Sequence, residues 1–203
     1  MRIVALVPVK DLARAKGRLT PPYTRDERAA FVRDTLAHVL RAITASGVVA
    51  RTLVVSPDAT VWEQAIALGA TSVPDTAGEL NRALDLARAV ALADGADAVL
   101  VVHADLPRLL PTEIAAMVAM LPVSPAAVLA PDHTGTGTNA LLLAPPDALP
   151  FRFGTGSFAR HRAEAAARAL PYVTYHAVGI AGDVDTPDDM VVAVSGQHPA
   201  VGE

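Results

Sequence analysis

Apolar residues along this chain fall into short, nearly unbroken runs that alternate with longer segments of mixed polarity. Ile3–Val9 is almost entirely apolar and rich in β-branched residues, which is typical of a strand buried on both faces. The same pattern predicts further strands at Arg51–Ser56, Ala70–Val73, Ala98–Val102, Ala126–Ala130, Thr138–Ala144 and Tyr172–Val178. Continuous rather than alternating hydrophobicity favours a mainly parallel sheet that is covered on both sides.

The segments between these runs carry helix signals. Thr24, followed three residues later by Glu27, is a capping-box pattern, and it predicts a helix that ends near Ser46, before Gly47. Further helices are expected from a cap at Asp58 to Leu68, at Asn81–Asp94, from a cap at Thr112 to Met120, from a cap at Ser157 to Leu170, and from Thr186-Pro187 onward. Alternating strands and helices predict a single α/β domain over residues 1–196, followed by a flexible tail at 197–203.

Composition narrows the class of protein further. The chain has 203 residues, of which 52% are hydrophobic and 19% charged, and this excludes a disordered polyelectrolyte. It has no cysteine, which excludes disulfides, thiolate metal sites and a cysteine nucleophile. No apolar run approaches the length of about 20 residues that a membrane span needs, and the first residues lack signal-peptide architecture. We therefore expect a cytoplasmic protein with no membrane partner.

The net charge of −4 argues against a nucleic-acid partner, but the charge is unevenly distributed. Residues 1–33 carry a balance of +5, whereas the remaining 170 carry −9. Both lysines of the chain, Lys10 and Lys16, lie just after the first strand, and Arg18 follows them. With Gly17 allowing close backbone approach, such a loop suits phosphate groups. It does not match a Walker A loop, and a solvated basic loop is the alternative.

Ligands of parallel sheets bind beyond the carboxyl ends of the strands, so the loops after residues 9, 56, 102 and 182 deserve most weight. Asp105 directly follows the buried strand at Ala98–Val102, where a carboxylate can bind Mg²⁺ or cap a turn. Asp183 and Asp185 are two residues apart, so in an extended segment both can reach one cation. Capping of the following helix is the alternative for this pair.

Two further segments, at residues 132–139 and 153–158, are rich in glycine and hydroxyl side chains. The second ends at a predicted helix start, where backbone N–H groups can bind an anion, although ordinary turns explain either segment alone. Asn81 opens a predicted helix as a cap or as a nucleotide contact. We expect His38 and His161 on exposed helix surfaces, His103 beside the site in a minor role, and Arg160 and Arg162 on a solvated face unless they meet a ligand phosphate.

Taken together, these segments resemble a known family. The sequences VPVKDLARAKGRL, GELNRAL, HADLP, DHTGTGTNALLL, FRFGTGSFARH and DVDTPDDM are similar, in this order, to the guanylyltransferases of deazaflavin coenzyme biosynthesis. The resemblance covers about residues 2–194. Two positions depart from the usual family pattern: Gly17 stands where serine is commoner, and His103 stands where a small residue is commoner.

The resemblance implies a single-domain nucleotidyltransferase fold of the glycosyltransferase-A type, with a mainly parallel central sheet. It implies transfer of GMP from GTP to phosphoenolpyruvate or 2-phospho-L-lactate, and a downstream enzyme that consumes the product as a further partner. By matching position, Asp105, Asp183 and Asp185 would hold Mg²⁺, expected as two ions, and Lys10, Lys16 and Arg18 would lie along the phosphates. Asn81 would hold the nucleoside, and Thr138, Gly154 and Ser157 would receive the carboxylate of the acceptor.

The mechanism we expect needs no protein nucleophile, because a phosphate with a second pKa of about 6 is largely a dianion at neutral pH. It would attack the α-phosphorus of GTP in line, and pyrophosphate would leave, with the metals and the cations aligning the groups and neutralising their charge. Two alternatives stay open. One is a molybdopterin-guanylyl or sugar-nucleotide enzyme of the same fold, and the other is a non-catalytic nucleotide-binding regulator.

Overall fold

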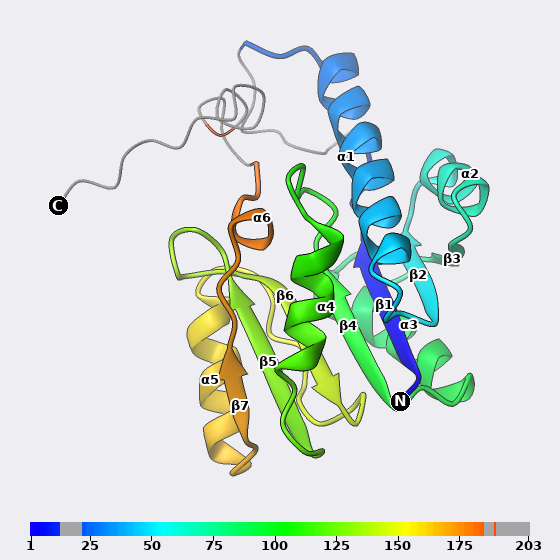
Figure 1. The fold of residues 1–203 in the computed structure, drawn as a ribbon. Helices are drawn as coiled ribbons and strands as arrows, with labels where there is room; N and C mark the ends of the chain where they lie inside the picture. Colours follow the sequence, from blue (N-terminus) through cyan, green and yellow to red (C-terminus); the bar gives the residue numbers. More distant parts are fainter. Residues whose placement is uncertain (13–21, 185–188, 190–203) are drawn as a thin grey trace, which may run out of the picture.

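The computed structural model describes residues 1–12, 22–184 and 189, and within them it forms one seven-stranded sheet (Figure 1). The strands are β1 (Ile3–Pro8), β2 (Arg51–Ser56), β3 (Thr71–Pro74), β4 (Ala98–Val102), β5 (Ala126–Pro131), β6 (Thr138–Ala144) and β7 (Tyr172–Thr174). Their order is β3-β2-β1-β4-β6-β5-β7. Only β6 of these strands runs antiparallel to its neighbours, β4 and β5, so the predicted mainly parallel sheet is confirmed.

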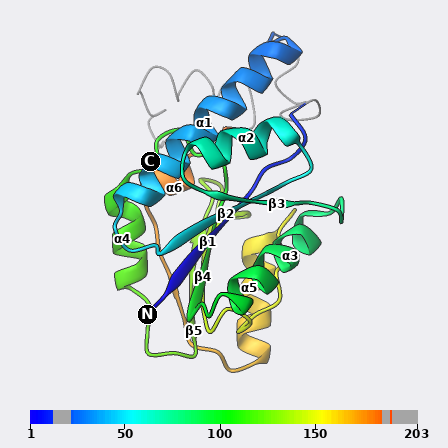
Figure 2. The ribbon, with the colours of Figure 1, turned by 90° about the vertical axis from the view of Figure 1, so that its right-hand side faces the viewer.

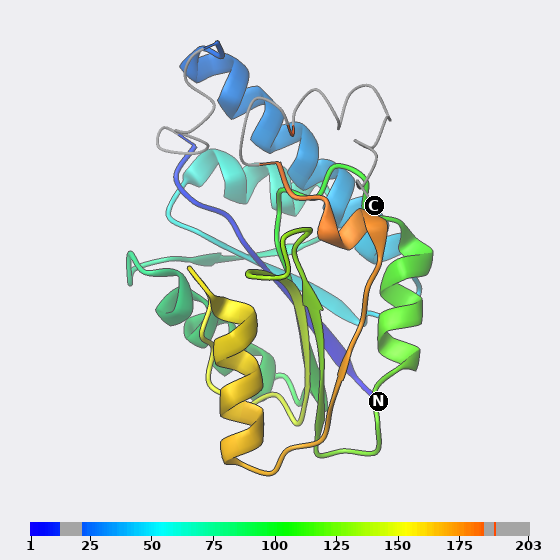
Figure 3. The ribbon, with the colours of Figure 1, turned by 90° about the vertical axis from the view of Figure 1, so that its left-hand side faces the viewer.

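Helices cover both faces of the sheet (Figures 2 and 3). The helices are α1 (Arg25–Ala45), α2 (Ala59–Ala67), α3 (Leu80–Ala93), α4 (Pro111–Ala119), α5 (Ser157–Ala167) and α6 (Val178–Ala181). Buried residues of α1, α2, α4 and α6 share one hydrophobic core, while those of α3 and α5 contribute to the other. This three-layer arrangement leaves the ends of the strands as the places where loops can form a site.

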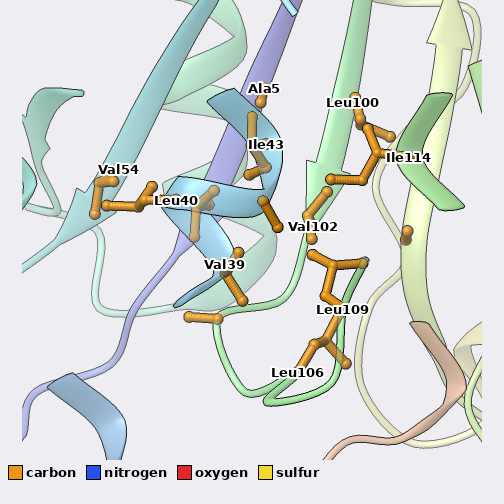
Figure 4. Close-up of a cluster of buried hydrophobic side chains, with 14 of the residues drawn as sticks. Ala5, Val39, Leu40, Ile43, Val54, Leu100, Val102, Leu106, Leu109 and Ile114 are labelled. Atoms are coloured by element: carbon orange, nitrogen blue, oxygen red, sulfur yellow. The ribbon is translucent and has the colours of Figure 1, made fainter. Parts of the chain in front are cut away.

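The loop that carries Asp105 is anchored in the larger core. Figure 4 shows Leu106 and Leu109 of this loop beside Val102 of β4 and Val39 of α1, and neither leucine is exposed to solvent. Exposing either leucine would cost about 2 kcal/mol of hydrophobic transfer free energy. The loop is therefore held against the core. Asp105, which lies between the buried Val102 and Leu106, is thereby held at the carboxyl end of β4.

Most predicted elements are present, and the capping box of α1 is confirmed by hydrogen bonds between Thr24 and Glu27. The caps predicted at Thr112 and Ser157 are wrong. Helix α4 begins at Pro111, with Leu110 rather than Thr112 in the cap position, because Glu113 accepts the Leu110 N–H. Helix α5 has Gly156 in the cap position, with a left-handed φ of 68°, which leaves the Ser157 hydroxyl available for other contacts.

The strand predicted at Tyr172–Val178 is also shorter than expected. Strand β7 ends at Thr174, and Val178 already begins helix α6. The predicted final helix after Thr186-Pro187 and the predicted tail lie outside the described residues. No helix in the described part of the chain is long and apolar enough to cross a membrane.

Candidate active site

The site is built at the end of the sheet where the carboxyl ends of β1 and β4 lie. These two parallel strands are neighbours at the centre of the sheet, yet the chain leaves β1 toward β2 on one side and leaves β4 toward the other. Lys10 follows β1 and Asp105 follows β4, so the structure brings a cation and a carboxylate to the topological switch point. Open α/β sheets bind their ligands at such a point.

Asp183 reaches the same place from the other end of the chain. The backbone N–H of Val184 donates to the carbonyl of Asp105 at 3.3 Å, which sets the two segments side by side. The Val184 side chain is 1% exposed and packs with Tyr23 and Phe31 near the start of α1. The segments of Asp105 and Asp183 therefore meet, although 78 positions separate the two residues in the sequence.

Asn139 on β6 holds Asp183, and we did not single it out from the sequence. Its Nδ2 donates to Oδ1 of Asp183 at 3.0 Å and to the carbonyl of Ile180 at 2.9 Å. Asn139 is 3% exposed, while the Asp183 side chain keeps 16% of its surface exposed. Nδ1 of His133 lies 3.6 Å from the same Oδ1. The signal was present in the GTGTN motif, whose last residue is this asparagine.

A second group of polar side chains lies beneath the start of α5. Ser157 Oγ is 3.2 Å from Thr138 Oγ1, and Thr138 Oγ1 is 3.1 Å from His161 Nδ1. The second ring nitrogen of His161, Nε2, accepts the backbone N–H of Arg152 at 3.0 Å. Thr138 and Ser157, predicted from different segments, are therefore brought together, and His161 joins them.

The surface position expected for His161 is wrong, because this side chain has no exposed surface. Burial, followed by the nearby guanidinium groups of Arg160 and Arg152, lowers the pKa of His161 to about 4, so its imidazole is neutral at pH 7. The edge of its ring meets Phe153, with the ring centroids 4.9 Å apart. His38 is only half-buried rather than exposed, and its Nε2 lies 2.9 Å from the carbonyl of Leu109.

Two glycines shape the segment that leads into Ser157. Gly154 has a φ of 108° and Gly156 a φ of 68°, and among the described residues the N–H groups of residues 154–156 make no hydrogen bond. The Arg160 guanidinium donates to the carbonyl of Phe153 at 3.2 Å and so lies next to Gly154. Arg162 instead contacts Tyr172 and Phe158, away from this group.

Asn81 does not cap α3. Glu79 occupies the cap position, and the Asn81 amide pairs with the backbone of Phe153 in both directions, at 2.8 Å and 3.2 Å. This pairing fixes the segment that leads into Gly154. A contact of Asn81 with a nucleoside stays a prediction.

Three predicted site residues, Lys16, Arg18 and Asp185, lie outside the described residues. Within the described ranges, no three histidine or acidic side chains are grouped closely enough to hold a metal ion. His103 contacts Phe153, the same ring that meets His161, with the two ring planes tilted and their centroids 5.3 Å apart.

Solved structures with this architecture show which kind of fold it is. A nucleotidyl transferase from Methanothermobacter superposes with a TM-score of 0.69 at 14% identity, covering 97% of this chain and 99% of that one. Glucosyl-3-phosphoglycerate synthase from Mycobacterium tuberculosis, solved with Mn²⁺, UDP and phosphoglyceric acid, superposes with a TM-score of 0.62 at 17% identity. The match covers 97% of this chain and 75% of that one. The fold is that of nucleotidyltransferases and glycosyltransferase-like enzymes.

Sequence comparisons then give the family. The family model described as guanylyl transferase CofC like matches residues 1–198. The phosphoenolpyruvate guanylyltransferase of Sphaerobacter thermophilus is 46% identical over 94% of this chain and 91% of its own length. The phosphoenolpyruvate guanylyltransferase of Rubrobacter xylanophilus is 42% identical over 94% of this chain and 92% of its own length. The chain belongs to the CofC-like guanylyl transferase family and is an enzyme of the nucleotidyltransferase type.

Proposed function

We propose that this enzyme transfers GMP from GTP to the phosphate of phosphoenolpyruvate and releases pyrophosphate, in the biosynthesis of a deazaflavin coenzyme. One observation supports the proposal. In this chain, which belongs to a guanylyl transferase family, Lys10, Asp105, Asp183 and the Thr138–Ser157 pair all lie at the same end of the sheet, where β1 and β4 end. The names of the two relatives support phosphoenolpyruvate over 2-phospho-L-lactate as acceptor.

In this proposal the phosphates of GTP lie along the segment after β1. Lys10 is exposed at the end of that strand, where its ammonium can meet a phosphate without first breaking a buried contact. Lys16 and Arg18 would extend the same basic segment toward the pyrophosphate that leaves. The +5 balance of residues 1–33 supports this assignment, because a triphosphate is the most highly charged group that the reaction handles.

The carboxylate of the acceptor would lie at the start of α5, on Thr138, Gly154 and Ser157. The unbonded N–H groups of residues 154–156, the positive end of the α5 dipole and the nearby Arg160 guanidinium all favour a negative charge there. Asn81 would support this subsite through Phe153 and approach the nucleoside from α3.

The donor set also suits a divalent cation. Asp105 and Asp183 present carboxylate oxygens from adjoining segments, and hard oxygen ligands are those that Mg²⁺ prefers. With Asp185 they would hold Mg²⁺, for which we propose two ions. A bound divalent cation would offset the charge that develops on the phosphate oxygens and orient the two phosphates.

The residues of the chain then act by positioning and by charge. The acceptor phosphate is already nucleophilic as its dianion, so no side chain has to remove a proton before it attacks the α-phosphorus. Lys10, Lys16 and Arg18 would stabilise the charge moving onto the leaving pyrophosphate, while the α5 subsite fixes the acceptor for in-line attack.

The direct test measures pyrophosphate release from GTP with phosphoenolpyruvate, 2-phospho-L-lactate, 3-phosphoglycerate or no acceptor. We expect release only with a phospho-acid present, and the highest kcat/KM with phosphoenolpyruvate. Equal release without an acceptor would contradict the proposal. Preference for a sugar phosphate added to the same panel would instead support the sugar-nucleotide alternative.

A further inference from the structure

The hydroxyls of Thr138 and Ser157 and the imidazole of His161 form a buried chain of hydrogen bonds, in the order Ser157, Thr138, His161. At most 2% of the surface of any of the three residues is exposed. Water therefore cannot exchange freely with these groups, and each hydrogen in the chain has to be assigned to a specific contact. That assignment determines whether the chain offers a ligand a donor or an acceptor.

The two neighbours of the imidazole fix its tautomer. The Arg152 backbone N–H can only donate, so Nε2 of His161, 3.0 Å away, has to present its lone pair. Burial and the flanking Arg160 and Arg152 disfavour a second proton, against the weaker opposite effect of Glu164. The one ring proton is consequently on Nδ1, and it donates to Thr138 Oγ1 at 3.1 Å.

With this tautomer, one hydroxyl hydrogen of the Thr138–Ser157 pair has no acceptor within the chain of hydrogen bonds. The Thr138 and Ser157 hydroxyls hold two hydrogens, and their mutual contact at 3.2 Å uses one of them, whichever oxygen donates. Among the described residues, neither hydroxyl makes a further hydrogen bond besides the one to His161. With the opposite tautomer, Nδ1 would accept from Thr138, Thr138 would accept from Ser157, and no hydrogen would be left.

We propose that His161 is a positioning residue that makes the Thr138–Ser157 pair a donor-only contact for an anionic oxygen of the acceptor. This inference rests on the proposed function and deepens it, because it explains how the subsite selects a carboxylate. Ser157 directly follows residues 154–156, whose N–H groups are unbonded within the described part of the chain, so the surplus hydroxyl hydrogen adds one more donor to this segment. A ligand that presents an N–H or O–H there would meet only donors.

Two substitutions separate this role from a purely structural one. In His161→Asn the amide nitrogen can occupy the place of Nδ1 and donate to Thr138, but the Arg152 N–H loses its acceptor. In His161→Gln the amide oxygen can occupy the place of Nε2 and accept that N–H, but the donor to Thr138 is lost. A lone pair of Thr138 is then free, so the Thr138–Ser157 pair is no longer held as a donor-only contact. We expect His161→Gln to raise KM for phosphoenolpyruvate about 10- to 100-fold, with kcat and KM for GTP little changed.

His161→Asn should raise the same KM much less, although it should lower the melting temperature more than His161→Gln. A merely structural histidine predicts the reverse order of KM, with the glutamine variant closer to wild type, and that result would overturn the inference. Wild-type enzyme that shows no activity with phosphoenolpyruvate would instead contradict the proposed function, so the two failures are distinguishable.

A spectroscopic measurement does not depend on either variant folding. In wild-type protein labelled with ¹⁵N-histidine, the two ring nitrogens of His161 should appear as a protonated Nδ1 and an unprotonated Nε2 at pH 7. A protonated Nε2 with a free Nδ1, or a doubly protonated ring, would overturn the inference whatever the substrate is.

Discussion

Asp183 is the residue on which the metal assignment depends most directly within the described chain. Its Oδ1 accepts from Asn139, and its backbone follows α6 into contact with the Asp105 segment. Replacing it by asparagine keeps the shape of the side chain and leaves an oxygen for Asn139. The charge at the sheet edge is therefore the main property that this substitution changes.

We expect Asp183→Asn to lower kcat/KM by about 100-fold or more while the thermal unfolding midpoint changes little. The matched control is Asp147→Asn, because Asp147 is exposed after β6, at the opposite edge of the sheet. Pyrophosphate release measured over a range of Mg²⁺ concentrations checks both variants. Wild-type turnover in Asp183→Asn at every concentration would rule out this ligand.

The buried His161 makes a separate prediction about stability. Its pKa is about 4 in the folded protein and about 6.5 when unfolded, so the unfolded state binds the extra proton as the pH falls. The free energy of unfolding should consequently be unaffected by this group above pH 6.5 and should fall by about 2 kcal/mol between pH 6.5 and 5. Urea denaturation of wild type and His161→Gln at both pH values measures the difference. Parallel pH dependences in the two proteins would refute the assigned pKa.

Single residues were also where the sequence was least informative. The spacing of His161 on its helix does not reveal that β6 and the Arg152 backbone surround it, because those contacts join residues 9 and 23 positions apart. The position of Asn81 at a helix start predicts a local cap or a nucleotide contact, whereas its partner in the structure is Phe153, 72 positions away. Local patterns predict local hydrogen bonds, and neither of these residues makes its main contacts locally.

Among the elements, α6 has the most direct effect on the site, since it ends two residues before Asp183. It is held against α4 by Glu113, which accepts the N–H of Gly179 at 2.8 Å through Oε1 and the N–H of Leu110 at 3.0 Å through Oε2. A Cβ at Gly179 would lie within 2.4 Å of the Arg108 carbonyl. Glycine at this position allows the two segments to pack closely.

Gly179→Ala should therefore push α6 away from α4, lower the unfolding free energy by about 1–3 kcal/mol and reduce turnover at saturating substrate about tenfold or more. Gly47→Ala is the control, because Gly47 follows α1, has a positive φ of 68° and, unlike Gly179, has open space around it, so only backbone strain is added. Comparable stability loss with unchanged turnover is expected for the control. Full activity in Gly179→Ala would show that α6 does not position Asp183.

The elements themselves were largely predictable, because buried strands and capped helices depend on short sequence patterns. The errors came where tertiary contacts replaced local ones. Glu113 rather than Thr112 satisfies the start of α4, and Gly156 frees Ser157 for Thr138. The segment after Thr174 reads as a continuing strand, but it leaves the sheet and coils into α6 beside β5 and β6.

At the scale of the whole molecule, the uneven charge and the order of the strands lead to the same edge. Strands β1 and β4 lie side by side although β2 and β3 intervene in the sequence, and this crossover places the segments that carry Lys10 and Asp105 at the ends of neighbouring strands. The fold class was predictable from alternating strands and helices. That the loops after residues 9, 102 and 182 lie at one end of the sheet was predictable from the parallel architecture. That the segments at 132–139 and 153–158 join them was predictable only through the family resemblance, since no local pattern encodes it.

The central claim is that GMP, rather than a phosphoryl group, moves to the acceptor. It is tested most directly with GTP labelled at the α-phosphorus, phosphoenolpyruvate and Mg²⁺, followed by separation of the products. We predict that the label enters an adduct with the acceptor, in one-to-one proportion with unlabelled pyrophosphate. Label recovered in GDP, with the acceptor gaining only the γ-phosphate or nothing, would contradict the account.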